Sequence, residues 1–135
     1  LDFACGAGVI ASYLMLTYPH LKMQLSDISA LAIYASAMTL AANGQSATLH
    51  AANGLYGIEG KVQHIVTNPP FHTGLKTDYT ITKRFIEDAR KMLSQNGTLQ
   101  MVANRFLPYP GLLSEHFPRV LTTAQTTQFS LYQAA

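Results

Sequence analysis

Short apolar runs alternate with longer amphipathic segments along most of this chain, and this alternation constrains the fold more than any other feature. The apolar runs predict strands and the longer segments predict helices, in the order β-α-β-α-β-(α)-β-α-β. Such an order predicts an α/β fold with helices on both faces of a mostly parallel sheet. The last two apolar runs are joined by a short polar connection, which predicts a C-terminal antiparallel hairpin.

The patterns also predict where the elements lie. Strands are expected at residues 1–4, 22–26, 47–51, 62–67, 98–103, 119–124 and 128–132. Helices are expected at 9–18 and 30–42, from a cap at Asp78 or Thr80 to about 93, and at 112–116. Ser29 is expected to cap the second helix, and Asn96-Gly97 to form the turn before the strand at 98–103. Helical spacing predicts buried stripes of Ile10, Tyr13, Leu14 and Leu16 on the first helix, and of Ile81, Phe85, Ile86, Ala89 and Leu93 on the third.

Length and composition favour one folded domain at residues 1–135. Hydrophobic residues make up 48% and charged residues 12%, and no apolar run approaches the ~18–20 residues that span a bilayer. The single cysteine, Cys5, excludes an intrachain disulfide and favours a reducing cytoplasmic setting. The net charge of +2 permits an anionic partner such as RNA but does not require one. Because the chain opens at Leu1 inside an expected strand, we expect a fragment of a longer protein with a truncated first strand.

The junction of the first strand and helix, Asp2-Phe3-Ala4-Cys5-Gly6-Ala7-Gly8, has the composition of a cofactor loop. Its glycines permit a tight turn and close approach of a ligand, and the helix that follows offers free N–H groups. Asp27 ends the next strand, where an acid can accept hydrogen bonds from a ribose diol. Cys5 is expected to be a small buried residue under the loop.

Two cofactors fit this loop. Gly6-x-Gly8-x-x-Ala11 satisfies the dinucleotide fingerprint and would indicate an NAD- or FAD-dependent oxidoreductase. The Asp2 carboxylate would repel a pyrophosphate, whereas it suits the ammonium and sulfonium of S-adenosylmethionine. Simpler alternatives are that Asp2 is a turn residue and that Asp27 is an acid favoured by the helix dipole.

The tetrapeptide Asn68-Pro69-Pro70-Phe71 follows the expected strand at 62–67. Its prolines stiffen the backbone and provide no N–H, so the Asn68 side-chain oxygen and the Pro69 carbonyl can both accept from a ligand. Two acceptors beside the aromatic face of Phe71 form a receptor for a planar group that carries an NH2. A proline-rich loop that only ends the strand is the alternative. A catalytic role for Asn68, Pro69 and Phe71 is expected if the receptor reading holds.

Together with Asn53 and the segment Val102-Ala103-Asn104-Arg105-Phe106-Leu107-Pro108-Tyr109, these motifs resemble class I S-adenosylmethionine-dependent methyltransferases. The chain is most similar to the C-terminal catalytic domain of small-subunit ribosomal RNA guanine-N2 methyltransferases of the RsmC type. The resemblance implies a three-layer Rossmann-like fold with seven strands in the order 3-2-1-4-5-7-6, strand seven being antiparallel. It also implies a related N-terminal domain in the full-length chain and a cytoplasmic protein that acts on ribosomal RNA or on the assembled small subunit.

The resemblance implies methyl transfer from S-adenosylmethionine to the exocyclic N2 of a guanine. It assigns cofactor binding to Asp2, Ala4, Gly6, Gly8, Asp27, Ile28, Asn53 and Asn68. Candidate substrate contacts are Pro70, His72, Lys76, Asn104 and Arg105. For His72, Lys76 and Arg105, which lie on loops expected to flank the same site, ordinary surface solvation is the alternative. No metal ligands are expected. The family has glycine where this chain has Ala4, so a positive φ there would strain the loop and weaken cofactor binding.

Other functions remain open from the residues alone. Adenine N6 and a protein glutamine amide also present a planar NH2, so the tetrapeptide does not separate them from guanine N2. A catalytically silent domain that docks RNA and an NAD-binding oxidoreductase are alternatives of a different class.

Overall fold

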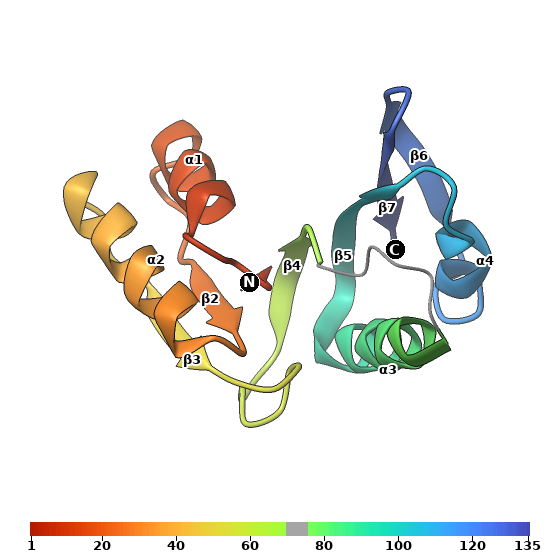
Figure 1. Cartoon of the computed structure of the whole chain (residues 1–135), viewed down its shortest axis with the longest axis horizontal. Helices are drawn as coiled ribbons and strands as arrows, with labels where there is room; N and C mark the ends of the chain where they lie inside the picture. The colour runs from red at the N-terminus through yellow and green to blue at the C-terminus, as the bar shows by residue number, and fades with distance from the viewer. Residues whose placement is uncertain (70–75) are drawn as a thin grey trace. The chain divides into compact units, whose positions relative to one another are not determined.

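The computed structural model describes residues 1–69 and 76–135 of the chain, with only the backbone at 76–78. Within these described residues it contains seven strands and four helices (Figure 1). The chain divides into two compact units, Leu1–Glu59 and Gly60–Ala135. Both units combine strands with helices, which confirms the predicted α/β class.

The first unit is built from three short parallel strands and two helices. Its elements are β1 (Asp2–Phe3), α1 (Val9–Thr17), β2 (Gln24–Asp27), α2 (Ala30–Ala42) and β3 (Thr48–Ala51). β2 lies between β1 and β3, with Leu25 opposite Asp2 and Asp27 opposite Ala51. Because the strands are parallel, the loops that follow them meet at one edge of the sheet.

The core of this unit lies between its helices and strands. Cys5, Ala11, Met15, Met23, Leu25 and Leu40 form one buried cluster. The Ser29 hydroxyl accepts a hydrogen bond from the Ala32 N–H at 3.3 Å, which confirms the predicted cap of α2. This packing fixes the loops that follow β1 and β2.

The second unit contains a parallel pair of strands extended by an antiparallel hairpin. Its elements are β4 (Val62–Thr67), α3 (Lys76–Met92), β5 (Leu93–Asn104), α4 (Tyr109–Ser114), β6 (Val120–Gln125) and β7 (Phe129–Ala134). β5 pairs in parallel with β4 and antiparallel with β7, and β6 pairs with β7. The side chains of Phe85, Ile86 and Ala89 on α3 are buried, as predicted.

The strand order agrees with the prediction in both units. It is 3-2-1 in the first unit and 4-5-7-6 in the second, with β7 antiparallel to its neighbours. The predicted C-terminal hairpin is therefore confirmed, although its strands begin and end slightly later in the chain than expected.

The predicted buried stripe on α1 is wrong at two positions. Tyr13 and Leu16 are exposed, whereas Ala11, Ser12 and Met15 are buried. The side of α1 that faces the core is therefore the one that bears Ala11, Ser12 and Met15. On α3 the prediction also fails for Ile81, which is half exposed.

The start of β5 also differs from the prediction. The strand begins at Leu93 and runs through Asn96-Gly97, which was expected to be a turn. A Cβ on Gly97 would lie 2.9 Å from the Gln63 carbonyl oxygen, so glycine permits close contact with β4 here. The register between β4 and β5 shifts near the same point, between Val62 and His64. Gly97 therefore allows β5 to lie close to β4 at the point where their pairing is irregular.

Two smaller features complete the fold. α4 begins at Tyr109, three residues before the expected start, because Pro110 is tolerated in the first turn of a helix. In the described part of the chain, no helix combines the length and the apolar character needed to cross a membrane.

Candidate active site

The loop after β1 adopts three left-handed backbone conformations within five residues. Ala4 has a φ of 55°, Gly6 of 55° and Gly8 of 73°. Glycine accepts such angles at no steric cost, whereas an alanine is strained by about 1–2 kcal/mol. The positive φ of Ala4 therefore strains the loop, because this chain has a Cβ at a position that favours glycine.

Gly8 is required both by its angle and by its surroundings. A Cβ there would lie 2.9 Å from the Ser36 hydroxyl oxygen and 3.1 Å from a methyl carbon of Leu25. Gly8 is also the residue that precedes α1, so its conformation directs the free N–H groups of that helix. By contrast, a Cβ on Gly6 would meet nothing within 4 Å, so Gly6 is needed for its backbone angle alone.

The loop is held to the rest of the first unit by hydrogen bonds on both sides of Gly6. The Gly6 N–H donates to Asp27 Oδ2 at 2.9 Å, and the Ser36 hydroxyl donates to the Gly6 carbonyl at 2.9 Å. The Ser36 oxygen also lies 3.4 Å from the Cys5 sulfur. These contacts tie the loop to the end of β2 and to the middle of α2, so the loop conformation is supported by distant parts of the chain.

Asp2 is a fully buried carboxyl group at the start of this loop. Its Oδ2 accepts a hydrogen bond from the Ala11 N–H at 3.1 Å, in the first turns of α1. Within the described part of the chain, its Oδ1 is buried and has no hydrogen-bond partner. Burial raises the pKa of Asp2 to about 6, and the hydrogen bond from the Ala11 N–H opposes this shift. A buried oxygen without a partner is costly, and a cationic ligand would relieve that cost.

Asp27 is a half-buried acid that already accepts two hydrogen bonds. Its Oδ1 accepts from the Ser29 N–H at 2.9 Å, while its Oδ2 accepts from the Gly6 N–H. A carboxylate has about four acceptor sites, so two remain for a ligand hydroxyl. Asp27 thus stabilises the start of α2, as expected for an acid at the N-terminus of a helix. It can still accept hydrogen bonds from a ligand.

The remaining predicted cofactor residues of this unit lie at the same edge. The Ala52 N–H donates to the Asp27 carbonyl at 3.0 Å, which places the segment after β3 beside the end of β2. Ile28 and Asn53 are both exposed there. The structure therefore brings together seven of the residues predicted from the sequence: Asp2, Ala4, Gly6, Gly8, Asp27, Ile28 and Asn53.

Cys5 is buried and belongs to the core cluster, as predicted. Burial raises the pKa of its thiol, so the residue packs as a neutral side chain. Ser36 was not singled out from the sequence, although it binds the loop and limits the space at Gly8. Its only sequence signal is a polar residue within an otherwise apolar helix.

The second unit contains the described residues that were predicted to bind the substrate. Asn68 and Pro69 follow the carboxyl end of β4, with the Asn68 side chain exposed and Pro69 buried. Asn104 ends β5, and the exposed Arg105 follows it. β4 and β5 are parallel, with Thr67 opposite Met101, so both sets lie at one edge of this unit.

Several predicted residues lie outside the described part of the structure. Pro70, Phe71 and His72 are not described, and Lys76 is described only as the first residue of α3. Among the described residues, no group of three or more histidine, cysteine, aspartate or glutamate side chains is arranged to hold a metal ion.

The sequence was compared with models of known protein families. Residues 1–133 match the methyltransferase small domain family. The chain belongs to this family. The glycine loop after β1 and the acid that ends β2 both lie within the matched residues.

Two curated relatives in this methyltransferase family are named ribosomal RNA small subunit methyltransferase C. The one from Alteromonas mediterranea is 75% identical over 134 residues, covering 99% of this chain and 37% of that protein. The one from Pseudoalteromonas atlantica is 46% identical over 132 residues, covering 98% of this chain and 38% of that protein. The chain thus spans less than two fifths of the length of these relatives. The predicted resemblance to the RsmC type is confirmed.

Solved structures share the fold over nearly the whole chain. The 16S rRNA N2 G1207 methyltransferase (RsmC) of T. thermophilus, solved with AdoMet and guanosine, has a TM-score of 0.83 at 25% identity, covering 98% of this chain and 36% of that one. A ribosomal protein L11 methylase from Lactobacillus delbrueckii subsp. bulgaricus has a TM-score of 0.79 at 20% identity, covering 98% of this chain and 67% of that one. The second likeness concerns the fold alone. The predicted class I methyltransferase fold is confirmed.

Proposed function

We propose that this methyltransferase domain transfers a methyl group from S-adenosylmethionine to the exocyclic N2 of a guanine in small-subunit ribosomal RNA. The names of the similar proteins and the residues at the two strand edges support the same reaction. The domain is a minor part of the length of its relatives, so the activity of the intact protein is included in this proposal.

The observation that carries the cofactor assignment is the buried Asp2 carboxylate. Its Oδ1 has no partner among the described residues, and it lies just before the loop whose left-handed Gly6 and Gly8 lead into the N-terminus of α1. The ammonium of the methionine end would supply the missing donor to Oδ1. Asp27 has acceptor sites left for the ribose hydroxyls, and the exposed Ile28 offers an apolar surface for the adenine. The donor set therefore fits S-adenosylmethionine.

The same carboxylate argues against a dinucleotide. A pyrophosphate at this loop would be repelled by the buried negative charge of Asp2. Among the described residues, no lysine or arginine forms an ion pair with Asp2 that would neutralise this charge. The match to the dinucleotide fingerprint therefore does not favour an oxidoreductase.

The residues that follow β4 in the second unit indicate which group accepts the methyl. The Asn68 side-chain oxygen and the Pro69 carbonyl would accept the two protons of the guanine amine, and Phe71 would stack on the base. The target base leaves its own stack to reach these groups, which costs a few kcal/mol. Guanine is preferred over adenine and glutamine because the RsmC of T. thermophilus was solved with guanosine.

The chain contributes mainly position and electrostatics to this reaction. Bound S-adenosylmethionine supplies an electrophilic methyl group on a sulfonium. Asn68 and Pro69 orient the nitrogen lone pair and disperse the positive charge that develops on the nitrogen. Asp2 and the loop after β1 hold the cofactor in one position, which supplies much of the rate by orientation. The product nitrogen is acidic and releases its proton without a strong base from the protein.

The proposal extends to the setting of the reaction. The substrate is ribosomal RNA, either free or in the assembled small subunit, and the reaction takes place in the cytoplasm. The additional length of the relatives provides room for the related N-terminal domain that the resemblance implies.

A methyl-transfer assay with product identification tests the proposal. The intact protein is incubated with radiolabelled S-adenosylmethionine and either small-subunit RNA or assembled subunits, and the RNA is digested to nucleosides. The expected product is N2-methylguanosine. Label in N6-methyladenosine or in a protein amide would contradict the guanine assignment, and binding of NADH without binding of S-adenosylmethionine would contradict the whole proposal.

A further inference from the structure

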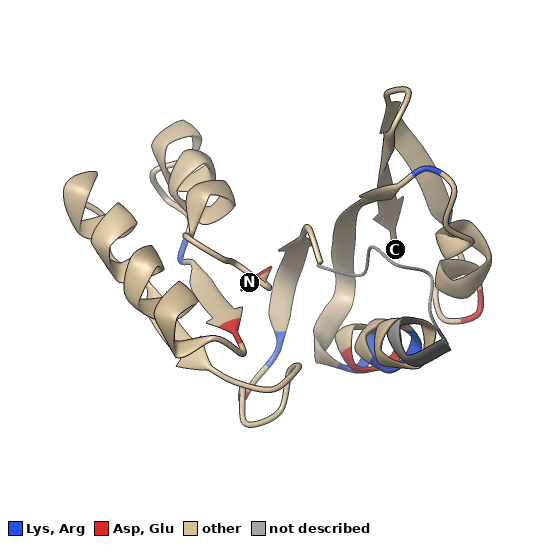
Figure 2. Cartoon of the chain, viewed as in Figure 1, with Lys and Arg blue, Asp and Glu red and all other residues tan. Residues whose placement is uncertain are grey.

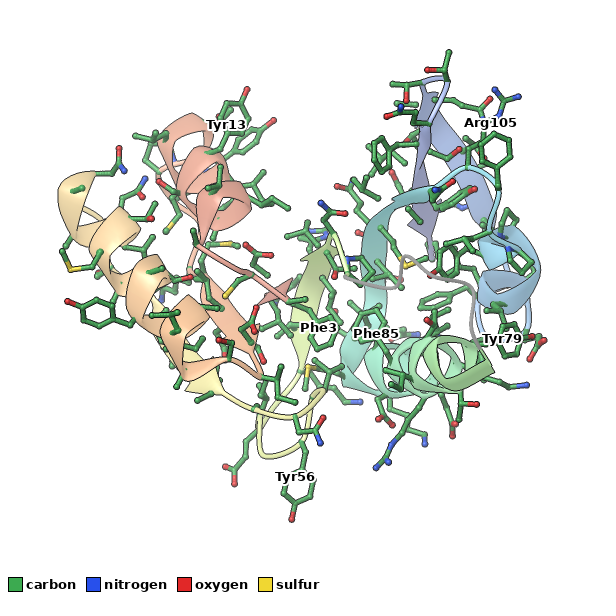
Figure 3. The ribbon with its side chains drawn as sticks, viewed as in Figure 1. Phe3, Tyr13, Tyr56, Tyr79, Phe85 and Arg105 are labelled. Carbon is green, nitrogen blue, oxygen red and sulfur yellow. The ribbon has the colours of Figure 1, made fainter. Side chains whose placement is uncertain are left out.

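Two phenyl rings and a guanidinium group are exposed where β5 ends in the second unit. Phe106 is 82% exposed and Phe129 is 42% exposed, although Phe85 and Phe117 of the same unit are buried. The neighbouring Arg105 is also exposed. Figure 3 shows the Arg105 side chain extending from the loop after β5, near the hairpin of β6 and β7. Exposed apolar side chains that lie close together can mark an interaction site, whereas single ones are ordinary.

Strand pairing and hydrogen bonds order the backbone at these three residues. Asn104 and Phe129 are opposite each other in the β5–β7 pair. The Arg105 N–H donates to the Gln128 carbonyl at 2.8 Å, and the Phe106 N–H donates to the Asn104 side-chain oxygen at 3.1 Å. Both segments are therefore ordered before any ligand arrives, which lowers the entropy cost of binding.

The charge around these residues favours an anionic partner. From Leu93 to Ala135 the chain has one acidic residue, Glu115, and its carboxylate lies 2.8 Å from the Lys83 ammonium. Among the described residues, no ion pair involves Arg105. Figure 2 shows the basic position on the loop after β5 apart from the acidic position that follows α4. Exposed aromatic rings beside an arginine suit an unpaired nucleotide, whose base stacks and whose phosphate binds the guanidinium.

Arg105, Phe106 and Phe129 also lie at the edge of the second unit where Asn68 and Pro69 follow β4. Thr67 is opposite Met101 in the parallel β4–β5 pair, so Asn68 is one residue past this point and Asn104 is three residues past it. The difference of two residues corresponds to about 7 Å along the strands. Arg105 and Phe106 therefore follow the end of β5 at the same edge as Asn68 and Pro69, which follow β4, and Phe129 begins β7 opposite Asn104.

We propose that Arg105, Phe106 and Phe129 form a stacking surface for a single-stranded nucleotide next to the target guanine. The rings of Phe106 and Phe129 stack on the neighbouring base, while Arg105 binds its phosphate. This inference rests on the proposed function, because it names how the same site holds the RNA around the methylated base.

The test compares variants of the intact protein in two assays. The first measures KM and kcat of methyl transfer to small-subunit RNA, and the second measures affinity for a single-stranded guanine-containing oligoribonucleotide without turnover. Phe106→Ala should weaken RNA affinity and raise KM by roughly 5–150-fold, the range for losing one base–aromatic stack. The kcat and the affinity for S-adenosylmethionine should not change. Phe106→Trp should restore binding, whereas Phe106→Leu, which has no aromatic face, should not.

Tyr56→Ala is the matched control, because Tyr56 is an 86% exposed aromatic on the loop between β3 and β4. It should leave both assays unchanged. Arg105→Gln should reduce the salt dependence of oligonucleotide binding by about 0.7 in the slope of log K against log salt, the value for one contact to a single strand.

The outcomes separate this inference from the proposed function. Unchanged KM and RNA affinity in Phe106→Ala, with active wild-type protein, would overturn the stacking surface and leave the function intact. Wild-type protein that binds RNA through Phe106 but forms no N2-methylguanosine would support the surface and overturn the function. Wild-type protein that binds no single-stranded RNA but forms N2-methylguanosine in RNA or in assembled subunits would overturn the surface and leave the function intact.

Discussion

Replacement of Asp2 by asparagine should make the fold more stable and the cofactor site weaker. Burial raises the pKa of Asp2 from 3.8 to about 6, so the ionised carboxyl costs the fold about 3 kcal/mol at pH 7, at 1.36 kcal/mol per pKa unit. Asparagine removes the charge and keeps an oxygen for the Ala11 N–H. Its NH2 group has no partner among the described residues, which costs about 1–3 kcal/mol, so we expect a net gain of up to about 2 kcal/mol in unfolding free energy.

The sign of this effect depends on pH. Well below pH 3.8 the carboxyl is protonated in both the folded and the unfolded chain, so it costs nothing there. The cost grows as pH rises toward about 6 and is complete above that value. Urea unfolding at pH 7 should therefore show a larger difference between the Asp2→Asn variant and the wild type than unfolding at pH 4.

Cofactor binding should change in the opposite direction. The substitution removes a hydrogen bond between two charged groups, worth about 1.5–3 kcal/mol, so calorimetry should give a Kd for S-adenosylmethionine about 10–150-fold higher. The wild-type affinity should rise with pH through about 6, as Asp2 ionises, and the variant should lack this dependence. A variant that binds the cofactor as tightly as the wild type would refute the role given to Asp2.

Two further predictions concern the same loop. Ala4→Gly should raise the unfolding free energy by about 1 kcal/mol and tighten cofactor binding, because it relieves a left-handed alanine; reduced stability in urea unfolding would contradict this. Gly8→Ala should cost more than 2 kcal/mol and abolish cofactor binding, because its Cβ would clash with Ser36. Gly44→Ala is the control, since Gly44 has a φ of 64° with open space around it and should lose only about 1 kcal/mol. Equal losses at Gly8 and Gly44 would show that backbone strain alone matters.

The strands and the positions of the candidate site were predictable because local residues determine them. β4 has the predicted bounds, Val62–Thr67, since a polar residue precedes it and Asn68-Pro69 ends it. Asp27 ends β2 and Asn53 follows β3, and parallel strands bring such residues to one edge.

Features that depend on distant contacts were not predictable. Tyr13 and Leu16 were assigned to the core because α1 is apolar on most sides, so its periodicity does not identify the buried face. Ser36 binds Gly6 across thirty positions of the chain, and no local pattern records that contact. The Ala4 angle follows from the way the loop is tied to Asp27 and α2, which only the folded chain shows.

The central claim is that Asn68 activates the acceptor amine while the Asp2 loop holds the methyl donor. Single-turnover methyl transfer to small-subunit RNA by Asn68→Ala, together with calorimetry of S-adenosylmethionine, tests this directly. Asn96→Ala is the control, because Asn96 is an exposed asparagine in β5 of the same unit. We predict a rate at least about 100-fold lower in Asn68→Ala with nearly unchanged cofactor affinity, and no change in the control. Formation of N2-methylguanosine by Asn68→Ala at the wild-type rate would contradict the account.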